Sequence, residues 1–322
     1  MHIPDGFLDA RTAVVAGVLS AVGLGTALRH VSKKLPPKRV PLLGLGAAFV
    51  FAAQMLNFPV GIGVSGHMVG AVLIAALLGP SAAVVVLSAV LVVQCFVFGD
   101  GGVSALGANI LNMGLICGVG GWLIYFPITR IIKGVFGRIV AASFAAWCGT
   151  VLAAIACAGE LATSTKINIP WAIAFPAMAG VHMLIGVGEA IITALVLAAT
   201  WKARPELLDD SPTARPWRSY KPVLVYGGAI ALGLALFVSP YACPWPDGLE
   251  KFAEDSGVKA APPEHRSVPA LVPDYKIPGI ESVPLATAIA GVAGTVLAFG
   301  LSWGLARALV PRKPEEHLDA KP

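Results

Sequence analysis

The sequence predicts an all-α integral membrane protein, in which a seven-helix bundle is followed by a two-helix C-terminal module. Two observations lead to this prediction. Of the 322 residues, 57% are hydrophobic and only 13% are charged, whereas about a quarter of the residues in soluble domains are charged. The apolar residues also gather in runs of about 20, which is the length of a helix that crosses a bilayer.

Nine apolar runs are predicted as membrane spans. The first seven belong to the bundle and the last two to the C-terminal module. The third run is short and ends at Gly79-Pro80, a dipeptide typical of a turn. The predicted spans are residues 12–28, 40–57, 67–79, 81–98, 108–129, 139–159, 171–200, 222–240 and 284–306.

The distribution of Lys and Arg predicts the orientation of the chain. If the N-terminus is outside, 17 of the 23 Lys and Arg lie in cytoplasmic segments or in the C-terminal tail. Because cytoplasmic segments of membrane proteins are enriched in these residues, we expect an N-out, C-in protein. Topology therefore accounts for the net charge of +5, and we expect no nucleic-acid partner.

Composition divides the chain into two modules. Residues 1–201 hold the seven-helix domain, and residues 202–221 form a polar cytoplasmic linker. Residues 222–322 hold the last two helices around an extracytoplasmic loop, 241–283. This loop is rich in Pro and contains seven Asp or Glu against four Lys or Arg. Its acidic balance would attract a cation.

The N-terminus itself is a candidate metal ligand. The α-amine of Met1, the backbone amide nitrogen of His2 and the imidazole of His2 lie within chelating distance of one another. No basic segment and no small-residue cleavage site of a signal peptide precede the first span. His2 is also bulky for the aminopeptidase that removes initiator methionines. We therefore expect Met1 to keep its free amine.

His67 is the candidate fourth nitrogen ligand. It follows a glycine-spaced segment, residues 61–66, on the same predicted membrane face as Met1 and His2. Four nitrogens that include an amide favour a planar arrangement, which suits Ni(II) or Cu(II), whereas Zn(II) prefers a tetrahedron. Co(II) accepts several geometries. The residues by themselves leave open that both histidines are interfacial side chains without a ligand role.

Further polar side chains occur within the apolar runs, where such groups are often functional. His182 and Glu189 are seven residues apart and share a helix face. They could support the metal site, dock a partner, act as acid and base in a membrane enzyme, or form bonds between helices. The same alternatives, apart from catalysis, apply to Asn109 and Asn112, while Gln94 is best explained by a bond between helices. No GxxxxGK[ST] phosphate loop occurs, so ATP hydrolysis by that route is excluded.

Two motifs resemble a known transporter family. The start Met1-His2-Ile3-Pro4-Asp5-Gly6-Phe7, the pair Gly66-His67 and the seven-helix layout resemble the substrate-binding M component of nickel/cobalt energy-coupling-factor (ECF) transporters. The PDGLE segment, residues 246–250, and its flanking helices resemble the small N component. The resemblance implies a metal site made of the Met1 amine, the His2 amide and imidazole, and the His67 imidazole.

The resemblance also implies the function and the partners. The chain would be the substrate-specific subunit of an ATP-driven nickel uptake transporter in a bacterial or archaeal cell membrane, without catalytic residues of its own. Its partners would be a membrane coupling (T) protein and a pair of cytoplasmic ABC-type ATPases. The transported ligand would be Ni²⁺, and Co²⁺ for cobalamin synthesis is the alternative. The loop 241–283 would assist metal entry.

Overall fold

The computed structural model describes residues 1–61, 63–167, 169–208, 219–258 and 268–311. Parts of the predicted linker 202–221 and of the predicted loop 241–283 lie outside the described residues.

The N-terminal part is a bundle of helices with one small hairpin. Its elements are α1 (Ala10–Lys34), α2 (Val40–Gln54), β1 (Phe58–Gly61), β2 (Val64–Gly66), α3 (Ala71–Leu78), α4 (Pro80–Val93), α5 (Leu106–Asn109), α6 (Gly121–Ile131), α7 (Gly134–Thr163) and α8 (Trp171–Ala203). The π-helical segment η2 (Gln94–Phe98) continues α4, and the π-helical segment η3 (Ile110–Gly120) joins α5 to α6.

The described C-terminal part contains two long helices and several short helical segments. α9 (Lys221–Gly233) continues through the π-helical segment η5 (Leu234–Val238) and the short helix η6 (Ser239–Tyr241). The short helix α10 (Gly248–Asp255) and the turn η8 (Pro273–Tyr275) precede the long helix α11 (Val283–Leu309). Both long helices have a proline in their first turn, where its missing N–H leaves no bond unmade.

The predicted helical membrane protein is confirmed. Within the described residues, seven helices are long and apolar enough to cross a membrane. The second and third predicted spans are shorter in the structure, because α2 has 15 residues and α3 has eight. The prediction of a helix from residue 67 is wrong at its start. The antiparallel strands β1 and β2 and the irregular residues 67–70 precede α3, which begins only at Ala71.

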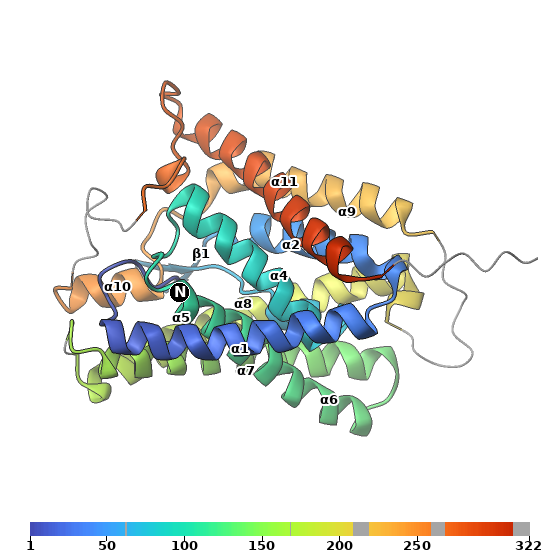
Figure 1. The fold of residues 1–322 in the computed structure, drawn as a ribbon, viewed down its shortest axis with the longest axis horizontal. Coiled ribbons are helices and arrows are strands. Elements are labelled where there is room, and N and C mark those ends of the chain that lie inside the picture. Colours follow the sequence, from blue (N-terminus) through green and yellow to red (C-terminus); the bar gives the residue numbers. More distant parts are fainter. Residues whose placement is uncertain (62, 168, 209–218, 259–267, 312–322) are drawn as a thin grey trace, which may run out of the picture.

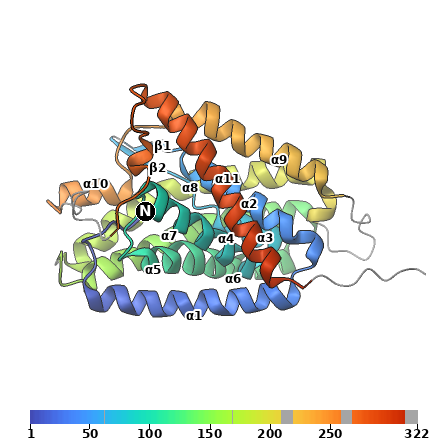
Figure 2. The same cartoon turned by 45° about the horizontal axis from the view of Figure 1, so that its top comes forward.

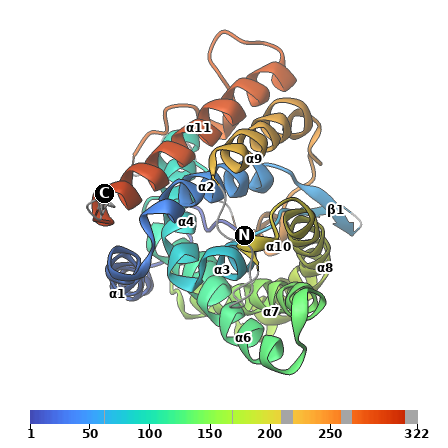
Figure 3. The ribbon, with the colours of Figure 1, turned by 90° about the vertical axis from the view of Figure 1, so that its right-hand side faces the viewer.

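α4 is the centre of the bundle. It packs against α1, α2, α3 and η3, and 78% of its apolar stretch is buried. Seen along the bundle, α9 and α11 lie beside α2 on one side, and α7 and α8 lie on the other (Figure 3). The N-terminus, the hairpin and α10 gather at one end, and α1 and α11 end at the other (Figures 1 and 2).

Glycine allows α11 to approach α2 closely. A Cβ at Gly294 would collide with the ring of Phe51, and a Cβ at Gly44 would lie 2.8 Å from the Cβ of Trp303. Ser302 adds a polar contact, since its hydroxyl donates to the carbonyl of Leu43 over 3.2 Å. Small residues at helix contacts are typical of packing in membranes. The C-terminal helix pair is thus closely fitted to the N-terminal bundle.

We expect Gly294→Ala to loosen this contact. The added methyl group must displace the buried ring of Phe51, and overpacking of this kind destabilises proteins by about 1–3 kcal/mol. Thermal unfolding of the purified protein in detergent measures the effect. The matched control is Gly300→Ala on the same helix, where no atom lies within 4 Å of the added carbon. Equal unfolding temperatures for the two variants would contradict the predicted packing.

Candidate metal centre

The first residues of the chain fold back into the bundle. The N–H of Ile3 donates to Oδ1 of Asn109 over 2.8 Å, and the Nδ2 group of Asn109 donates to the carbonyl of Ile3 over 3.1 Å. The N–H of Gly102 donates to the same carbonyl over 2.9 Å. Ile3 is completely buried. One asparagine on α5 therefore pairs with both polar groups of the Ile3 backbone and fixes Met1 and His2.

A turn at Asp5 and Gly6 makes this return possible. Gly6 has a φ of 93°, in the left-handed region that favours glycine. The Oδ1 atom of Asp5 accepts hydrogen bonds from the N–H and the hydroxyl of Ser104. A side chain at Gly102 would collide with the backbone of Asp5. The loop after η2 thus holds the N-terminal turn in place.

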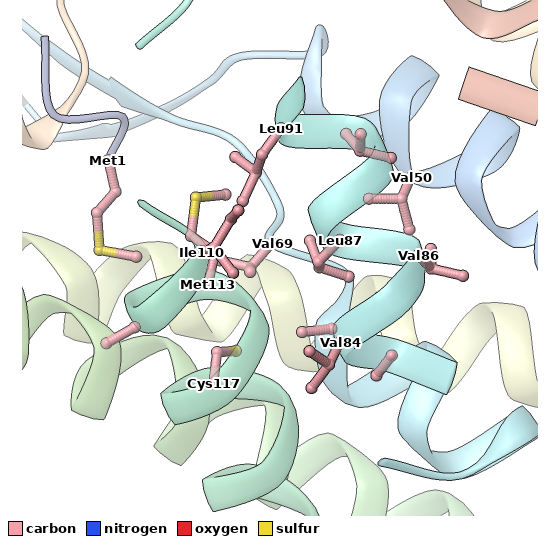
Figure 4. Close-up of a cluster of buried hydrophobic side chains, with 14 of the residues drawn as sticks. Met1, Val50, Val69, Val84, Val86, Leu87, Leu91, Ile110, Met113 and Cys117 are labelled. Atoms are coloured by element: carbon pink, nitrogen blue, oxygen red, sulfur yellow. The ribbon is translucent and has the colours of Figure 1, made fainter. Parts of the chain in front are cut away.

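Met1, His2 and His67 meet inside the protein. The terminal nitrogen of Met1 lies 3.3 Å from Nε2 of His67. The imidazole rings of His2 and His67 stack with their centres 5.1 Å apart and their planes 28° from parallel. The His2 and His67 side chains are only 6% and 8% exposed. The side chain of Met1 extends into the buried apolar cluster that also contains Val69 and Met113 (Figure 4).

The imidazoles of His2 and His67 both make hydrogen bonds through their ring nitrogens. Nδ1 of His67 lies 3.1 Å from the carbonyl of Met68. This nitrogen must therefore carry the proton, which leaves the lone pair on Nε2, beside Met1. Nε2 of His2 lies 3.1 Å from Oε1 of Gln94 and Nδ1 lies 3.3 Å from Oδ1 of Asp100, so that each ring nitrogen of His2 faces an acceptor. Such bonds are the usual way in which proteins orient metal-binding histidines.

A network of buried side chains connects these bonds. The Nε2 group of Gln94 donates to Oε1 of Gln54 over 2.8 Å, and the Nε2 group of Gln54 donates to the carbonyl of Val69 over 2.9 Å. The segment that carries His67 is therefore tied to the residue that orients His2.

Glu189 on α8 holds the same segment from the opposite side. Its carboxylate accepts hydrogen bonds from the N–H groups of Val69 and Gly70, over 2.5 and 2.8 Å. The side chain is fully buried. Gly66 allows the hairpin to approach α8, because a Cβ there would collide with Ile185. Glu189 thus substitutes for the backbone partners that the irregular stretch before α3 lacks.

Asp247 of the PDGLE segment reaches the terminal nitrogen of Met1. Its Oδ2 atom lies 2.5 Å from this nitrogen and 3.9 Å from Nε2 of His67. Its Oδ1 atom caps α10 by accepting from the N–H groups of Leu249 and Glu250, while the Glu250 carboxylate accepts from the N–H of Asp247. This reciprocal arrangement is a capping box.

Burial and charge set the protonation of these groups. Burial lowers the pKa of the Met1 amine, but the Asp247 carboxylate outweighs it, so that this pKa lies above its ordinary value. Burial raises the pKa of Asp247, but the amine outweighs it in turn, so that this pKa lies well below its ordinary range. Burial lowers the pKa of His2. At neutral pH the pair is therefore an ammonium ion and a carboxylate beside a neutral imidazole.

The space between these groups is small. A cavity of about 10 Å³ is lined by Met1, Gly66, His67, Val69, His182, Ile185 and Asp247, and such a volume corresponds to about one water-sized sphere. In the described part of the chain, no group of three or more His, Cys, Asp or Glu side chains is placed to hold a metal ion. A metal bound here would therefore need main-chain nitrogens in addition to the imidazoles.

The other polar residues singled out in the sequence have distinct positions. Asn109 and Glu189 support the backbone of the site, and Gln94 bonds both Gln54 and His2. His182 lines the cavity, with its Nδ1 bonded to the carbonyl of Met178 over 2.7 Å. Asn112 lies apart and donates to the carboxylate of Glu160 over 2.7 Å.

Sequence reasoning missed two carboxylates of the site. The contact of Asp247 with Met1 was not foreseen, although the PDGLE segment was singled out. Asp100 has Oδ1 3.3 Å from Nδ1 of His2 and accepts a hydrogen bond from the Tyr275 hydroxyl over 3.0 Å. The only local signal was Pro-Asp-Gly-Leu-Glu itself, which is typical of a capped helix start.

Comparisons with known proteins place the chain in a family. Residues 2–207 match the family described as cobalt uptake substrate-specific transmembrane region, and residues 221–311 match the PDGLE domain. The fused nickel transport protein NikMN of Rhodobacter capsulatus is 33% identical over 352 residues, which cover 97% of this chain and 99% of that protein. A relative in Archaeoglobus fulgidus, whose name also refers to a fused nickel transport protein, is 36% identical over 308 residues, which cover 95% of this chain and 98% of its own.

Other relatives match only the N-terminal part of the chain. The cobalt transport protein CbiM of Clostridioides difficile is 34% identical over 182 residues, which cover 56% of this chain and 68% of that protein. A crystal structure of a transition metal transporter superposes with a TM-score of 0.58 and 34% identity over 63% of this chain and 93% of that chain. The chain therefore belongs to the family of cobalt uptake substrate-specific transmembrane proteins, as an M component fused to an N component with a PDGLE domain.

Proposed function

We propose that this chain is the substrate-specific subunit of an ATP-driven nickel uptake transporter of the ECF type. It binds Ni(II) through the Met1 amine, the His2 amide and imidazole, and the His67 imidazole. ATP hydrolysis takes place in separate cytoplasmic ATPases, which a membrane coupling protein connects to this chain. Residues 1–201 form the metal-binding domain, and residues 222–322 form the N-type module beyond the linker 202–221.

One observation supports the ligand set above all others. The terminal nitrogen of Met1 and Nε2 of His67 are 3.3 Å apart inside the protein. Two nitrogens on one metal, with bonds of about 2 Å, lie about 2.8 to 3.3 Å apart. A chain terminus is usually exposed and mobile, whereas this one is buried against an imidazole whose lone pair faces it. This ordering is what a metal site would require if the Met1 amine is one of its ligands.

The distribution of charge supports the orientation in the cell membrane. The ends of α1 and α8 near the predicted cytoplasmic side carry Lys33, Lys34 and Lys202, whereas the metal centre is at the opposite end of the bundle (Figure 1). With the basic ends inside, the centre lies near the extracytoplasmic face. A divalent cation would then reach it from outside the cell.

Nickel is favoured over cobalt by the chemistry of the ligands. An ionised amide nitrogen between an amine and an imidazole holds its metal in a plane, and Ni(II) takes such a site readily. The two relatives that cover almost the whole chain are named for nickel transport. Cobalt is the second candidate, because the matching family and the C. difficile relative are named for cobalt.

A membrane enzyme that uses His182 and Glu189 has no support in the geometry. Both carboxylate oxygens of Glu189 accept hydrogen bonds from backbone N–H groups. Nδ1 of His182 is bonded within its own helix. The backbone thus engages both oxygens of Glu189, and of the two side chains only His182 lines the cavity.

The ligand set predicts that purified protein binds Ni(II) with a yellow, low-spin absorption band. His67→Ala should abolish this band, and so should one extra residue before Met1, because the extension converts the primary amine into an amide. Absorption spectroscopy and calorimetry in detergent measure both effects. His30→Ala, which removes an imidazole at the other end of α1, is the control and should bind like the wild type. A band that survives His67→Ala would exclude the ligand set.

The supporting role of Glu189 gives a second prediction. In Glu189→Gln an amide NH₂ group replaces one carboxylate oxygen and meets a backbone N–H of Val69 or Gly70, donor against donor. We expect about 10- to 100-fold weaker Ni(II) binding, as for other groups that orient metal ligands. The control is Thr193→Val, one turn further along α8, because the buried hydroxyl of Thr193 has no partner in the described structure. Equal nickel affinity of the Gln variant and the wild type would contradict this role.

A further inference from the structure

Asp247 divides its two carboxylate oxygens between two parts of the protein. Oδ1 accepts from the N–H groups of Leu249 and Glu250, over 2.8 and 2.9 Å, and thereby caps α10. Oδ2 has no part in the cap and lies 2.5 Å from the terminal nitrogen of Met1. A cap alone would be served by any short polar side chain. The second contact needs a negative charge, because it faces a buried ammonium group.

The position of Asp247 is fixed by the fold and not by Met1. The N–H of Ser65 donates to the carbonyl of Pro246 over 2.9 Å, and the Ser65 hydroxyl donates to the carbonyl of Trp245 over 2.6 Å. A Cβ at Gly248 would lie 3.0 Å from the imidazole of His182. The PDGLE segment therefore packs against β2 and α8. Its contact on β2, Ser65, lies two residues before the proposed ligand His67.

The net charge of the site can be compared with and without a bound metal ion. Without metal, the ammonium group of Met1 and the carboxylate of Asp247 cancel each other. With Ni(II) on an amine, an ionised amide and two neutral imidazoles, the ligands supply one negative charge against two positive charges. One further negative charge is needed inside the protein, since an unpaired buried charge is strongly unfavourable. The carboxylate of Asp247 supplies it at the same place.

We propose that Asp247, supplied by the C-terminal module, is the positioning and charge-balancing residue of the metal site. This inference rests on the proposed function. In the metal-free protein Asp247 holds the Met1 nitrogen beside His67. On metal binding the Met1 ammonium group and the His2 amide each release one proton to solvent, and the carboxylate remains as the counter-charge of the divalent cation.

Asp100 is less suited to this task. It is the other carboxylate beside the ligands, with Oδ1 3.3 Å from Nδ1 of His2. Its side chain is 31% exposed, whereas that of Asp247 is 13% exposed. Water screens the charge of an exposed carboxylate and leaves that of a buried one largely intact. Asp247 therefore dominates the electrostatics of the centre.

Asp247→Asn and Asp247→Ser separate the charge from the cap. Asn and Ser cap helices about as well as Asp, so α10 keeps its first turn while the charge is lost. We expect about 10- to 100-fold weaker Ni(II) binding in both variants, with the low-spin band unchanged at saturating nickel because all four nitrogens remain. We also expect a lower unfolding temperature of the metal-free protein, in which the Met1 ammonium has lost its partner.

Glu250→Gln is the matched control. It removes one negative charge from the same capping box, and the Gln oxygen still accepts from the N–H of Asp247. Its side chain is exposed and, within the described residues, its hydrogen bond is to Asp247 and not to Met1, so we expect nickel affinity within about twofold of the wild type. Wild-type affinity in both Asp247 variants, or an equal loss in Glu250→Gln, would overturn the role of Asp247. Absence of the low-spin band in the wild type would instead reject the proposed nickel site, which keeps the two failures distinct.

Discussion

The burial of the terminal nitrogen of Met1 is the constraint on which the rest of the centre depends. A charged group inside a protein needs an opposite charge and complete hydrogen bonding. Asp247 supplies the charge, and Asn109 supplies bonds to both polar groups of the Ile3 backbone. Loss of either partner would leave a buried polar group of the N-terminal segment without its counterpart, at a cost in stability. The ordered terminus is therefore a property of several helices together.

The proposed ligands lie on irregular backbone, and their support comes from regular helices. Residues 1–9 and 67–70 are neither helix nor strand, and such backbone at membrane depth requires partners inside the protein. Gln54, Asn109 and Glu189 provide them from α2, α5 and α8. The polar residues within the apolar helices thus supply the hydrogen bonds that the irregular backbone of the proposed metal site cannot make with itself.

Sequence patterns were most informative where structure is local. Apolar runs located the long helices to within a few residues, because a bilayer sets their length. The run at 67–79 misled, since the backbone bonds of residues 69 and 70 go to Glu189, more than 100 residues away. The contact of Asp247 with Met1 was missed for the same reason. The residues of its capping box lie within five positions of the sequence, whereas its contact with Met1 joins residues 246 positions apart.

The fusion of the two modules has a physical consequence for the centre. The PDGLE segment contacts the bundle at Ser65, at the Met1 nitrogen and beside His182. Ser65 and His67 belong to the same short stretch, so a movement of the segment would displace the proposed ligand His67 together with Asp247. A C-terminal module that only covered the centre would need none of these polar contacts. These contacts hold the PDGLE segment and its helix cap against the residues of the proposed metal site.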